Sequence, residues 1–209
     1  MATADRRQRE KEQRRKEIVD TAERLFYSKG FDNVSMDEIA ESVELSKGSL
    51  YLHFKNKDSL YFAIVDKVNT EFFRLFMENL DTNASGGDQI RSMIRFLVKF
   101  IKDHREYNDM ARTYGPLIWA RMNTEYDTIL AENAVAYNIW LDHAIRQGIE
   151  DGSLRKDLDP VLFGVYISMI SLSVVSPLPS WDKGLELYGI GYEGLVDNLE
   201  KFIGPSLIP

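Results

Sequence analysis

Apolar residues recur at helical spacing along most of the 209-residue chain, and strand-like alternation is rare. Gly30 supplies a left-handed stop after the first helical stretch, and Pro116 predicts a kink in the fourth. A polar, Gly-rich stretch at 81–88 is the clearest linker. The pattern therefore predicts an all-α protein. Its expected long helices lie at residues 9–28, 58–80, 89–104, 107–120, 124–150, 160–175 and 182–202.

Residues 35–57 contain the signals for two short helices around a tight turn. Ser35 is followed three residues later by Glu38, which is the spacing of a capping box. Ser46 can cap a second helix in the same way. Each start is flanked by a pair at hydrophobic-staple spacing, namely Val34 with Ile39 and Leu45 with Leu50. Two starts eleven residues apart fit a helix-turn-helix.

The second of these helices presents a face suited to a polyanion. Lys47 supplies charge, Tyr51 a hydroxyl and His53 an imidazole donor. Gly48 would allow close approach of backbone to a ligand. Helix starts expose free N–H groups to phosphate. The expected phosphate anchors are the starts at Ser35, Ser46 and Asn56, followed by Lys55 and Lys57.

Residues 31–60 resemble the DNA-binding head of the tetracycline-repressor (TetR) family of transcription regulators. In the first helix and its exit the matching residues are Ala22, Phe26, Gly30 and Phe31. They are followed by Ser35, Ile39, Ala40, Ser46, Gly48, Leu50, Tyr51, Phe54, Lys57 and Leu60. The resemblance implies a three-helix DNA-binding head with a basic arm at 1–57 and a ligand-binding and dimerisation body at 58–209. By resemblance, the residues used against DNA are Ser35, Ser46, Lys47, Gly48, Tyr51, His53 and Lys57.

Two positions depart from the family pattern. Glu44 stands in the turn where the family usually has Gly, and a non-glycine at positive φ costs roughly 1 kcal/mol. The turn is therefore expected to be wound differently. Leu52 stands where a second aromatic is common, and it would offer an apolar contact such as one with a thymine methyl.

The net charge of −7 is unevenly distributed along the chain. Residues 1–57 carry 12 Lys/Arg and 11 Asp/Glu, whereas residues 58–209 carry 14 and 22. The first sixteen residues hold seven Lys/Arg and three acids. They are equally consistent with a mobile basic arm that follows the DNA backbone or minor groove and with a solvated, frayed helix start.

The expected body is rich in aromatic residues, as a pocket for an apolar or aromatic effector would be. For any single aromatic, core packing is the commoner role. The candidate effector contacts combine polarity with apolar neighbours: Tyr114, Trp119, Met122, Tyr137 and Tyr166. The sequence does not separate a repressor from an activator. Repression is the commoner role in the family that the head resembles, and for a repressor we expect such an effector to release the protein from its operator.

The sequence of the last two predicted helices indicates a homodimer. Residues 161–175 are apolar apart from Ser and Tyr, too short for a comfortable membrane span of about 20 residues. They are expected to be buried, either inside the protein or at a subunit interface, and no membrane partner is expected. Gly164, Ser168 and Ser171 would allow close helix approach. Two such helices from each subunit could close a four-helix bundle, as in the family that the head resembles.

Little in the sequence favours catalysis. There is no cysteine, and neither His104 nor His143 has a histidine or carboxylate three or four residues away. Phosphate loops, nucleophile elbows and paired carboxylates in apolar runs are missing as motifs. We expect no enzyme activity, no cofactor, no metal and a cytoplasmic location, because the charged N-terminus does not resemble a secretory signal. A small helical enzyme, a ligand carrier and a protein-binding module are the competing classes.

Overall fold

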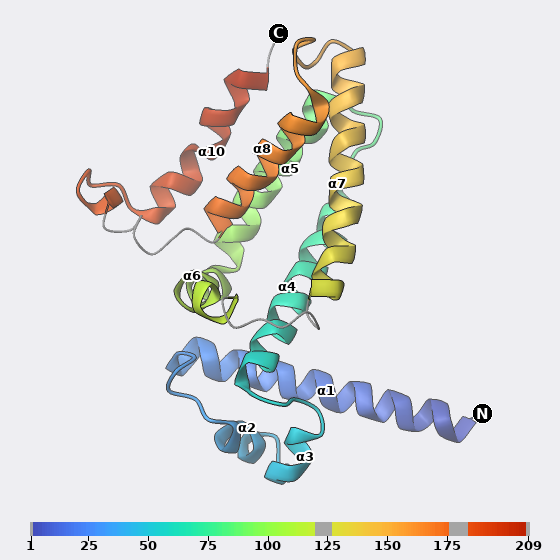
Figure 1. Cartoon of the computed structure of the whole chain (residues 1–209), viewed down its shortest axis with the longest axis vertical. Helices are drawn as coiled ribbons and strands as arrows, with labels where there is room; N and C mark the ends of the chain where they lie inside the picture. The colour runs from blue at the N-terminus through green and yellow to red at the C-terminus, as the bar shows by residue number, and fades with distance from the viewer. Residues whose placement is uncertain (1, 120–126, 176–183, 208–209) are drawn as a thin grey trace. The chain divides into compact units, whose positions relative to one another are not determined.

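The computed structural model describes residues 2–119, 127–175 and 184–207, and within these ranges every regular element is a helix (Figure 1). The all-α prediction is confirmed. The chain forms two compact units, Met1–Asn69 and Thr70–Pro209, which we call the head unit and the body unit. The division falls inside one long helix, α4, so the expected boundary at residue 57 stays a prediction. No helix in the described ranges has the length and apolar content needed to cross a membrane.

Three helices and the first half of a fourth build the head unit. They are α1 (Ala2–Lys29), α2 (Met36–Ser42), α3 (Lys47–Tyr51) and α4 (Lys57–Asn79). The apolar stripe of α1 packs against these elements, and its central residues Ile18, Ala22 and Phe26 are buried. Ile39 of α2 and Leu50 of α3 close the same core.

Side-chain caps fix where the short helices begin. The Ser35 hydroxyl accepts a hydrogen bond from the Glu38 amide at 3.1 Å, and the Ser46 hydroxyl accepts one from the Ser49 amide at 3.1 Å. Asn56 caps α4, because its Oδ1 accepts from the Ser59 amide at 2.8 Å. The three predicted helix starts are confirmed. The Glu38 carboxylate pairs with Lys29 of α1.

The turn between α2 and α3 is a Schellman motif. The Leu45 amide donates to the Ala40 carbonyl at 2.8 Å and the Glu44 amide donates to the Glu41 carbonyl at 3.1 Å. Glu44 itself has φ 54°. The expectation of a differently wound turn is therefore wrong, since Glu44 adopts the left-handed conformation that a glycine would take.

The body unit consists of the end of α4 and the helices that follow it in the chain. They are α5 (Gly86–Asp103), α6 (Arg105–Trp119), α7 (Asp127–Glu150), α8 (Pro160–Val175) and α10 (Tyr192–Leu207). Helix α5 contacts α7 and α10, and α7 contacts α8. The start of α5 crosses α7 very closely, because a Cβ at Gly86 would lie 2.2 Å from the Ala144 carbonyl oxygen and the Gly148 nitrogen.

Two predicted boundaries of the body unit are wrong. The stretch 182–202 is not one helix: residues 184–186 form a helical turn, the chain turns at 187–189, and α10 begins at Tyr192. Gly189 takes φ 67° at this break, a conformation that glycine adopts without steric cost. Helix α5 begins inside the expected linker, because Ser85 caps it by accepting from the Asp88 amide at 3.2 Å.

Candidate DNA-binding surface

The start of α3 and the first residues of α2 form an exposed polar surface on the head unit. Ser35, Ser46 and Gly48 are exposed, and the Lys47 side chain is 61% exposed. Tyr51 is 43% exposed and closes this surface at the end of α3. The residues expected to face outward at the start of α3 are therefore accessible.

Lys47 has a partner that the sequence did not indicate. Its ammonium lies 2.8 Å from a carboxylate oxygen of Asp37, in the first turn of α2. The hydrogen bond with Asp37, together with the charge of that carboxylate, raises the pKa of Lys47. Lys47 is thus fully charged at neutral pH, and an incoming phosphate would have to compete with Asp37 for it.

His53 lies between the end of α3 and α1. Its Nδ1 is buried and has no hydrogen-bond partner among the described residues. Burial lowers the pKa of His53, and the nearby charges of Lys11, Arg15 and Arg14 lower it further. Arg15 also donates to the His53 carbonyl at 3.2 Å. His53 is therefore neutral at pH 7 and only half-exposed, and its contact with DNA stays a prediction.

Lys57 is occupied inside the head unit. Its ammonium donates to the carbonyl oxygens of Phe31 at 2.6 Å and Val34 at 2.9 Å. It also lies 4.4 Å from the centre of the Phe31 ring, within the range of a cation–π contact. These bonds hold the loop between α1 and α2. A contact between Lys57 and DNA stays a prediction, and the structure gives this residue a second role.

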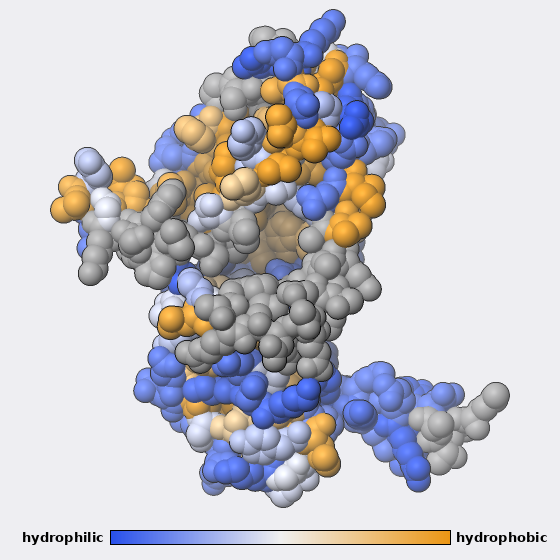
Figure 2. All heavy atoms as spheres, in the orientation of Figure 1, coloured by the Kyte–Doolittle hydropathy of each residue, from blue (hydrophilic) through white to orange (hydrophobic). Residues whose placement is uncertain are grey.

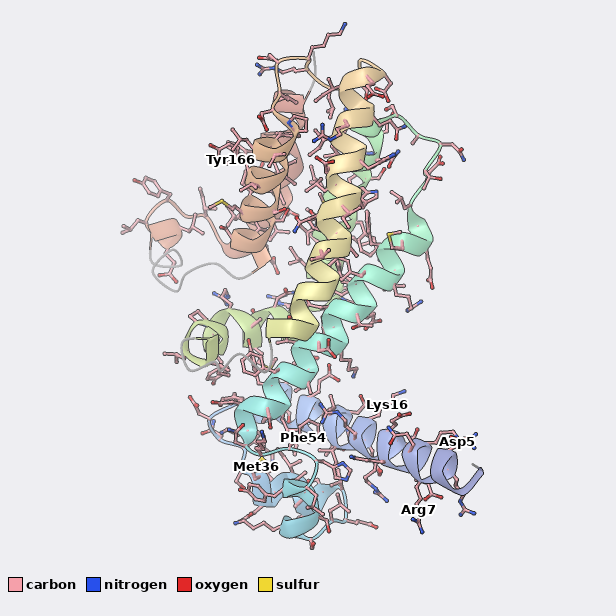
Figure 3. All side chains as sticks on the ribbon, turned by 45° about the vertical axis from the view of Figure 1, so that its right-hand side comes forward. Asp5, Arg7, Lys16, Met36, Phe54 and Tyr166 are labelled. Atoms are coloured by element: carbon pink, nitrogen blue, oxygen red, sulfur yellow. The ribbon has the colours of Figure 1, made fainter. Side chains whose placement is uncertain are left out.

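Tyr114, Tyr137 and Tyr166, the candidate effector contacts whose side chains are described, differ in their surroundings. Tyr137 points into the core, where its hydroxyl donates to the Met93 sulfur at 3.7 Å and burial raises its pKa to about 12. Tyr166 is 61% exposed and projects outward from α8 (Figure 3). Tyr114 is half-buried on α6, and Trp119 is the last residue of that helix. Met122 lies outside the described residues. The effector site stays a prediction.

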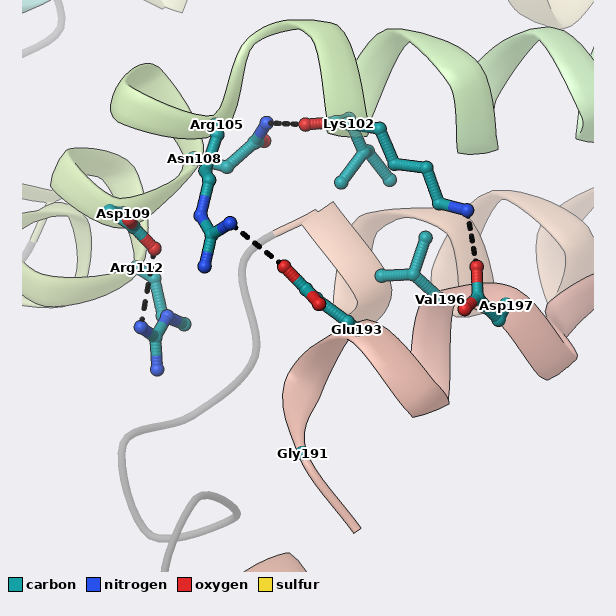
Figure 4. Close-up of a pocket in the computed structure, with 10 residues that line it drawn as sticks. Lys102, Arg105, Asn108, Asp109, Arg112, Gly191, Glu193, Val196 and Asp197 are labelled. Atoms are coloured by element: carbon teal, nitrogen blue, oxygen red, sulfur yellow. Dashed lines mark hydrogen bonds and ion pairs between the residues drawn. The ribbon is translucent and has the colours of Figure 1, made fainter.

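A charged pocket of about 580 Å³ lies where α5 and α6 face the start of α10 (Figure 4). The Arg105 guanidinium lies 3.0 Å from Glu193, and Lys102 pairs with Asp197. These two pairs tie α10 to α5 and α6. Among the candidate effector residues with described side chains, Tyr114, Tyr137 and Tyr166 do not line this pocket. The sequence patterns did not indicate this pocket, because the residues of each ion pair are about 90 positions apart in the chain.

An apolar groove of about 580 Å³ runs between α8 and α10. Tyr166, Met169 and Phe202 line it and are all more than half exposed. The adjoining surface of α8 is also apolar, and in Figure 2 apolar side chains gather over this part of the body unit. Within one chain α8 is therefore not buried on most sides, which excludes the first of the two alternatives drawn from its apolar sequence.

Three small residues of α8, Gly164, Ser168 and Ser171, face inward. Gly164 lies against Leu141 of α7, whose side chain is 3.7 Å from the position of a Cβ at residue 164. The hydroxyls of Ser168 and Ser171 are buried. The close approach that these residues permit is thus used between α7 and α8 of the same chain.

The capped helix-turn-helix, in a chain whose described elements are all helices, is the architecture of helix-turn-helix DNA-binding proteins. Residues 18–64 match the family model described as bacterial regulatory proteins, tetR family. The head unit of the chain is therefore similar to the DNA-binding part of the TetR family. The resemblance noted in the sequence is thereby confirmed.

Individual relatives agree with this assignment. The chain is 38% identical over 86 residues to IcaR of Staphylococcus epidermidis, a negative transcriptional regulator of a biofilm operon, covering 41% of this chain and 44% of that protein. The match therefore spans less than half the length of that relative. The repressor KstR2 of Mycolicibacterium smegmatis is 27% identical over 151 residues, 70% of each chain. A TetR/AcrR-family regulator from Thermobifida fusca has the same fold, with TM-score 0.69, 19% identity, and 91% and 96% of the chains covered.

Proposed function

We propose that the protein is a dimeric transcriptional repressor that a small apolar or aromatic effector releases from its operator. The observation that carries the DNA-binding part is the accessible start of α3, with Lys47 and Tyr51 exposed beside the capped helix ends at Ser35 and Ser46. Capped helix ends direct free N–H groups and positive dipole toward phosphate. The related IcaR and KstR2 are named as a negative regulator and a repressor.

In this proposal α3 enters the major groove and the start of α2 rests on the backbone. Lys47 contacts a base edge or a phosphate after leaving Asp37, and Tyr51 donates its hydroxyl to the backbone. Leu52 is 85% exposed and provides an apolar contact for a thymine methyl. Gly48 has no Cβ, and the space where one would stand is open, with Ser46 Oγ the nearest atom at 4.0 Å, so its backbone is accessible to the duplex.

The proposed homodimer uses the exposed apolar surface of α8 and α10. Val161, Val165 and Met169 lie at successive turns of α8, and Phe202 of α10 is 75% exposed. A twofold axis would place this surface against its copy and remove it from water, which is favourable at roughly 25 cal/mol per Å² of apolar area. Two heads could then read half-sites about 34 to 36 Å apart.

The proposed effector acts through the body unit. A cluster of aromatic rings surrounds Phe72 and Phe76 of α4, with Trp140 of α7 packed edge-on to Phe76 at 4.7 Å. Helix α4 continues into the head unit, so an effector that changes its packing can shift the population of DNA-competent dimers. A change of about 1.4 kcal/mol in that equilibrium alters operator occupancy tenfold.

The proposal is tested by selecting genomic fragments with the purified full chain and measuring the affinity for the selected duplex at several salt concentrations. A repressor of this kind binds with a steep loss of affinity as salt rises, whereas a protein-binding module would tolerate salt. An enzyme or carrier would retain no duplex at low salt. Adding candidate effectors to the complex then tests release, and unchanged affinity across a broad apolar panel would contradict the effector part alone.

The dimer is tested separately by sedimentation. Phe202→Glu would place a charge in the apolar groove, and we expect it to shift the protein toward monomer and to weaken operator binding. Glu150→Gln serves as a control on an exposed part of the body unit. A monomeric wild-type protein would contradict the dimer.

A further inference from the structure

Helix α1 extends well beyond the core of the head unit. Residues 5–17 are all exposed, and the first buried residue of the helix is Ile18. These thirteen residues form a rod about 20 Å long at 1.5 Å per residue. We call residues 5–17 the α1 extension. Of the two alternatives drawn from the sequence, a mobile arm and a solvated helix start, the second is nearer to what is found: a solvated helix continuous with the buried part of α1.

The α1 extension contains no apolar side chain. It consists of seven Lys/Arg, four Asp/Glu and two Gln. Its helix is supported by polar pairs one turn apart, such as Arg6 with Glu10 at 2.7 Å and Gln8 with Glu12 at 2.6 Å. A stable protein interface needs apolar or aromatic anchors in its centre. The extension therefore suits a polyanion and not a protein groove or a bilayer core.

The charges of the α1 extension are segregated around the helix. With 3.6 residues per turn, Arg7, Lys11 and Arg14 lie within roughly 40° of the buried Ile18, whereas Arg9 and Lys16 lie roughly 160 to 180° away. Figure 3 shows Arg7 on the side of α1 that faces α3, and Lys16 on the opposite side. We call the first side the Arg7 face; it comprises Arg7, Lys11, Arg14 and Arg15. The acids lie on the flanks and the far side.

The Arg7 face runs directly into the proposed DNA-binding surface. Arg15 reaches the end of α3, where its guanidinium lies 4.2 Å from the centre of the Phe54 ring and donates to the His53 carbonyl. Lys11 and Arg14 are near enough to His53 to lower its pKa. Arg7 and Lys11 have no acidic partner among the described residues, so their charges are available to a ligand.

We propose that the Arg7 face binds the phosphate backbone of the duplex next to the segment read by α3, and so lengthens the footprint of each head without reading bases. The proposal rests on DNA binding by α3. It adds sequence-independent affinity, because each phosphate neutralised by a side-chain cation releases counterions. A 20 Å rod spans roughly six base pairs at 3.4 Å each.

Two double variants of the full chain test the proposal. Arg7→Gln with Lys11→Gln removes two of the four cations of the Arg7 face, and Arg9→Gln with Lys16→Gln removes the same charges from the opposite side. All four positions are exposed. Each protein is titrated with two duplexes: the selected operator trimmed to about two helical turns, and the same operator extended by about one turn at each end.

We expect the wild type to bind the extended duplex more tightly than the trimmed one, and the Arg7-face variant to lose that gain. The slope of log affinity against log salt should fall by about 0.9 for each cation removed, which is roughly a tenfold effect per subunit between 50 and 200 mM salt. The opposite-side variant should match the wild type. Equal losses in both variants, or equal losses on both duplexes, overturn the proposal.

A measurement without DNA tests the geometry alone. Removing Lys11 from the vicinity of His53 should raise the pKa of that imidazole, as followed by proton NMR, and the opposite-side variant should leave it unchanged. A His53 pKa that does not move in the Arg7-face variant overturns the proposal. If the wild type binds neither duplex, the proposed function of the protein fails as well, so the two failures are distinguishable.

Discussion

Replacing Lys57 with methionine tests whether this residue holds the head unit together. The methionine keeps most of the aliphatic stem but cannot donate to the carbonyls of Phe31 and Val34. A hydrogen bond to a charged group contributes about 1.5 to 3 kcal/mol, and the side chain is half-exposed, so water compensates part of the loss. We expect local opening of α2 to become easier by about 2 to 3 kcal/mol.

Amide hydrogen exchange measures this opening in the intact protein. The amides of Ile39 and Val43 are bonded within α2 and its cap, and their protection should fall roughly 30- to 150-fold in Lys57→Met. Lys16→Met makes the same chemical change at an exposed position and should leave that protection unchanged. Unchanged protection in Lys57→Met, together with a salt slope of operator binding that falls by about one per subunit, would refute the structural role and identify Lys57 as a phosphate contact.

Three further changes have defined outcomes. Glu44→Gly should raise the stability of the head unit by up to about 0.5 kcal/mol, because relief of roughly 1 kcal/mol of left-handed strain is partly offset by the added freedom of the unfolded chain; a lower denaturation midpoint would contradict it. Asp37→Asn should tighten operator binding several-fold, because it frees Lys47 from its ion pair. Asp32→Asn is the control and should leave the affinity unchanged; fluorescence anisotropy measures the operator affinity of both variants. Hydrogen bonds from Ser153 and the Gly86 amide hold the pKa of Asp151 below its usual value. These bonds therefore stabilise the fold fully above about pH 4, and the stabilisation is lost as the pH falls through the folded pKa of Asp151. The thermal midpoint of Asp151→Asn should therefore be lower than wild type at pH 7, and the gap should close in acid.

Local features of the head were predictable from the sequence. A capping serine or asparagine acts on an amide three residues away, so Ser35, Ser46 and Asn56 mark helix starts without knowledge of the fold. The pairing of Lys47 with Asp37 was not predictable in this way, since it depends on how closely the two helices cross.

Errors in the body had physical causes that can be named. The break before α10 was signalled by Gly189, but the apolar spacing on both sides of it was continuous enough to predict one helix. The apolar run of α8 indicated burial, yet much of its surface is exposed in a single chain. A hydrophobic pattern records the surface that is covered in the functional assembly and does not say which chain covers it.

The close crossing of α5 and α7 at Gly86 and Gly148 determines where the body unit can change shape. The backbones are very close at that end, and Asp151 accepts from the Gly86 amide there at 2.9 Å, so separating the two helices at this point would break that bond. Any change in their angle must pivot about it. For the 18 residues of α5, about 27 Å of helix, a tilt of about 5° displaces the far end at Asp103 by about 2 Å. A small change in the angle between α5 and α7 therefore produces its largest displacement at the junction of α5 and α6.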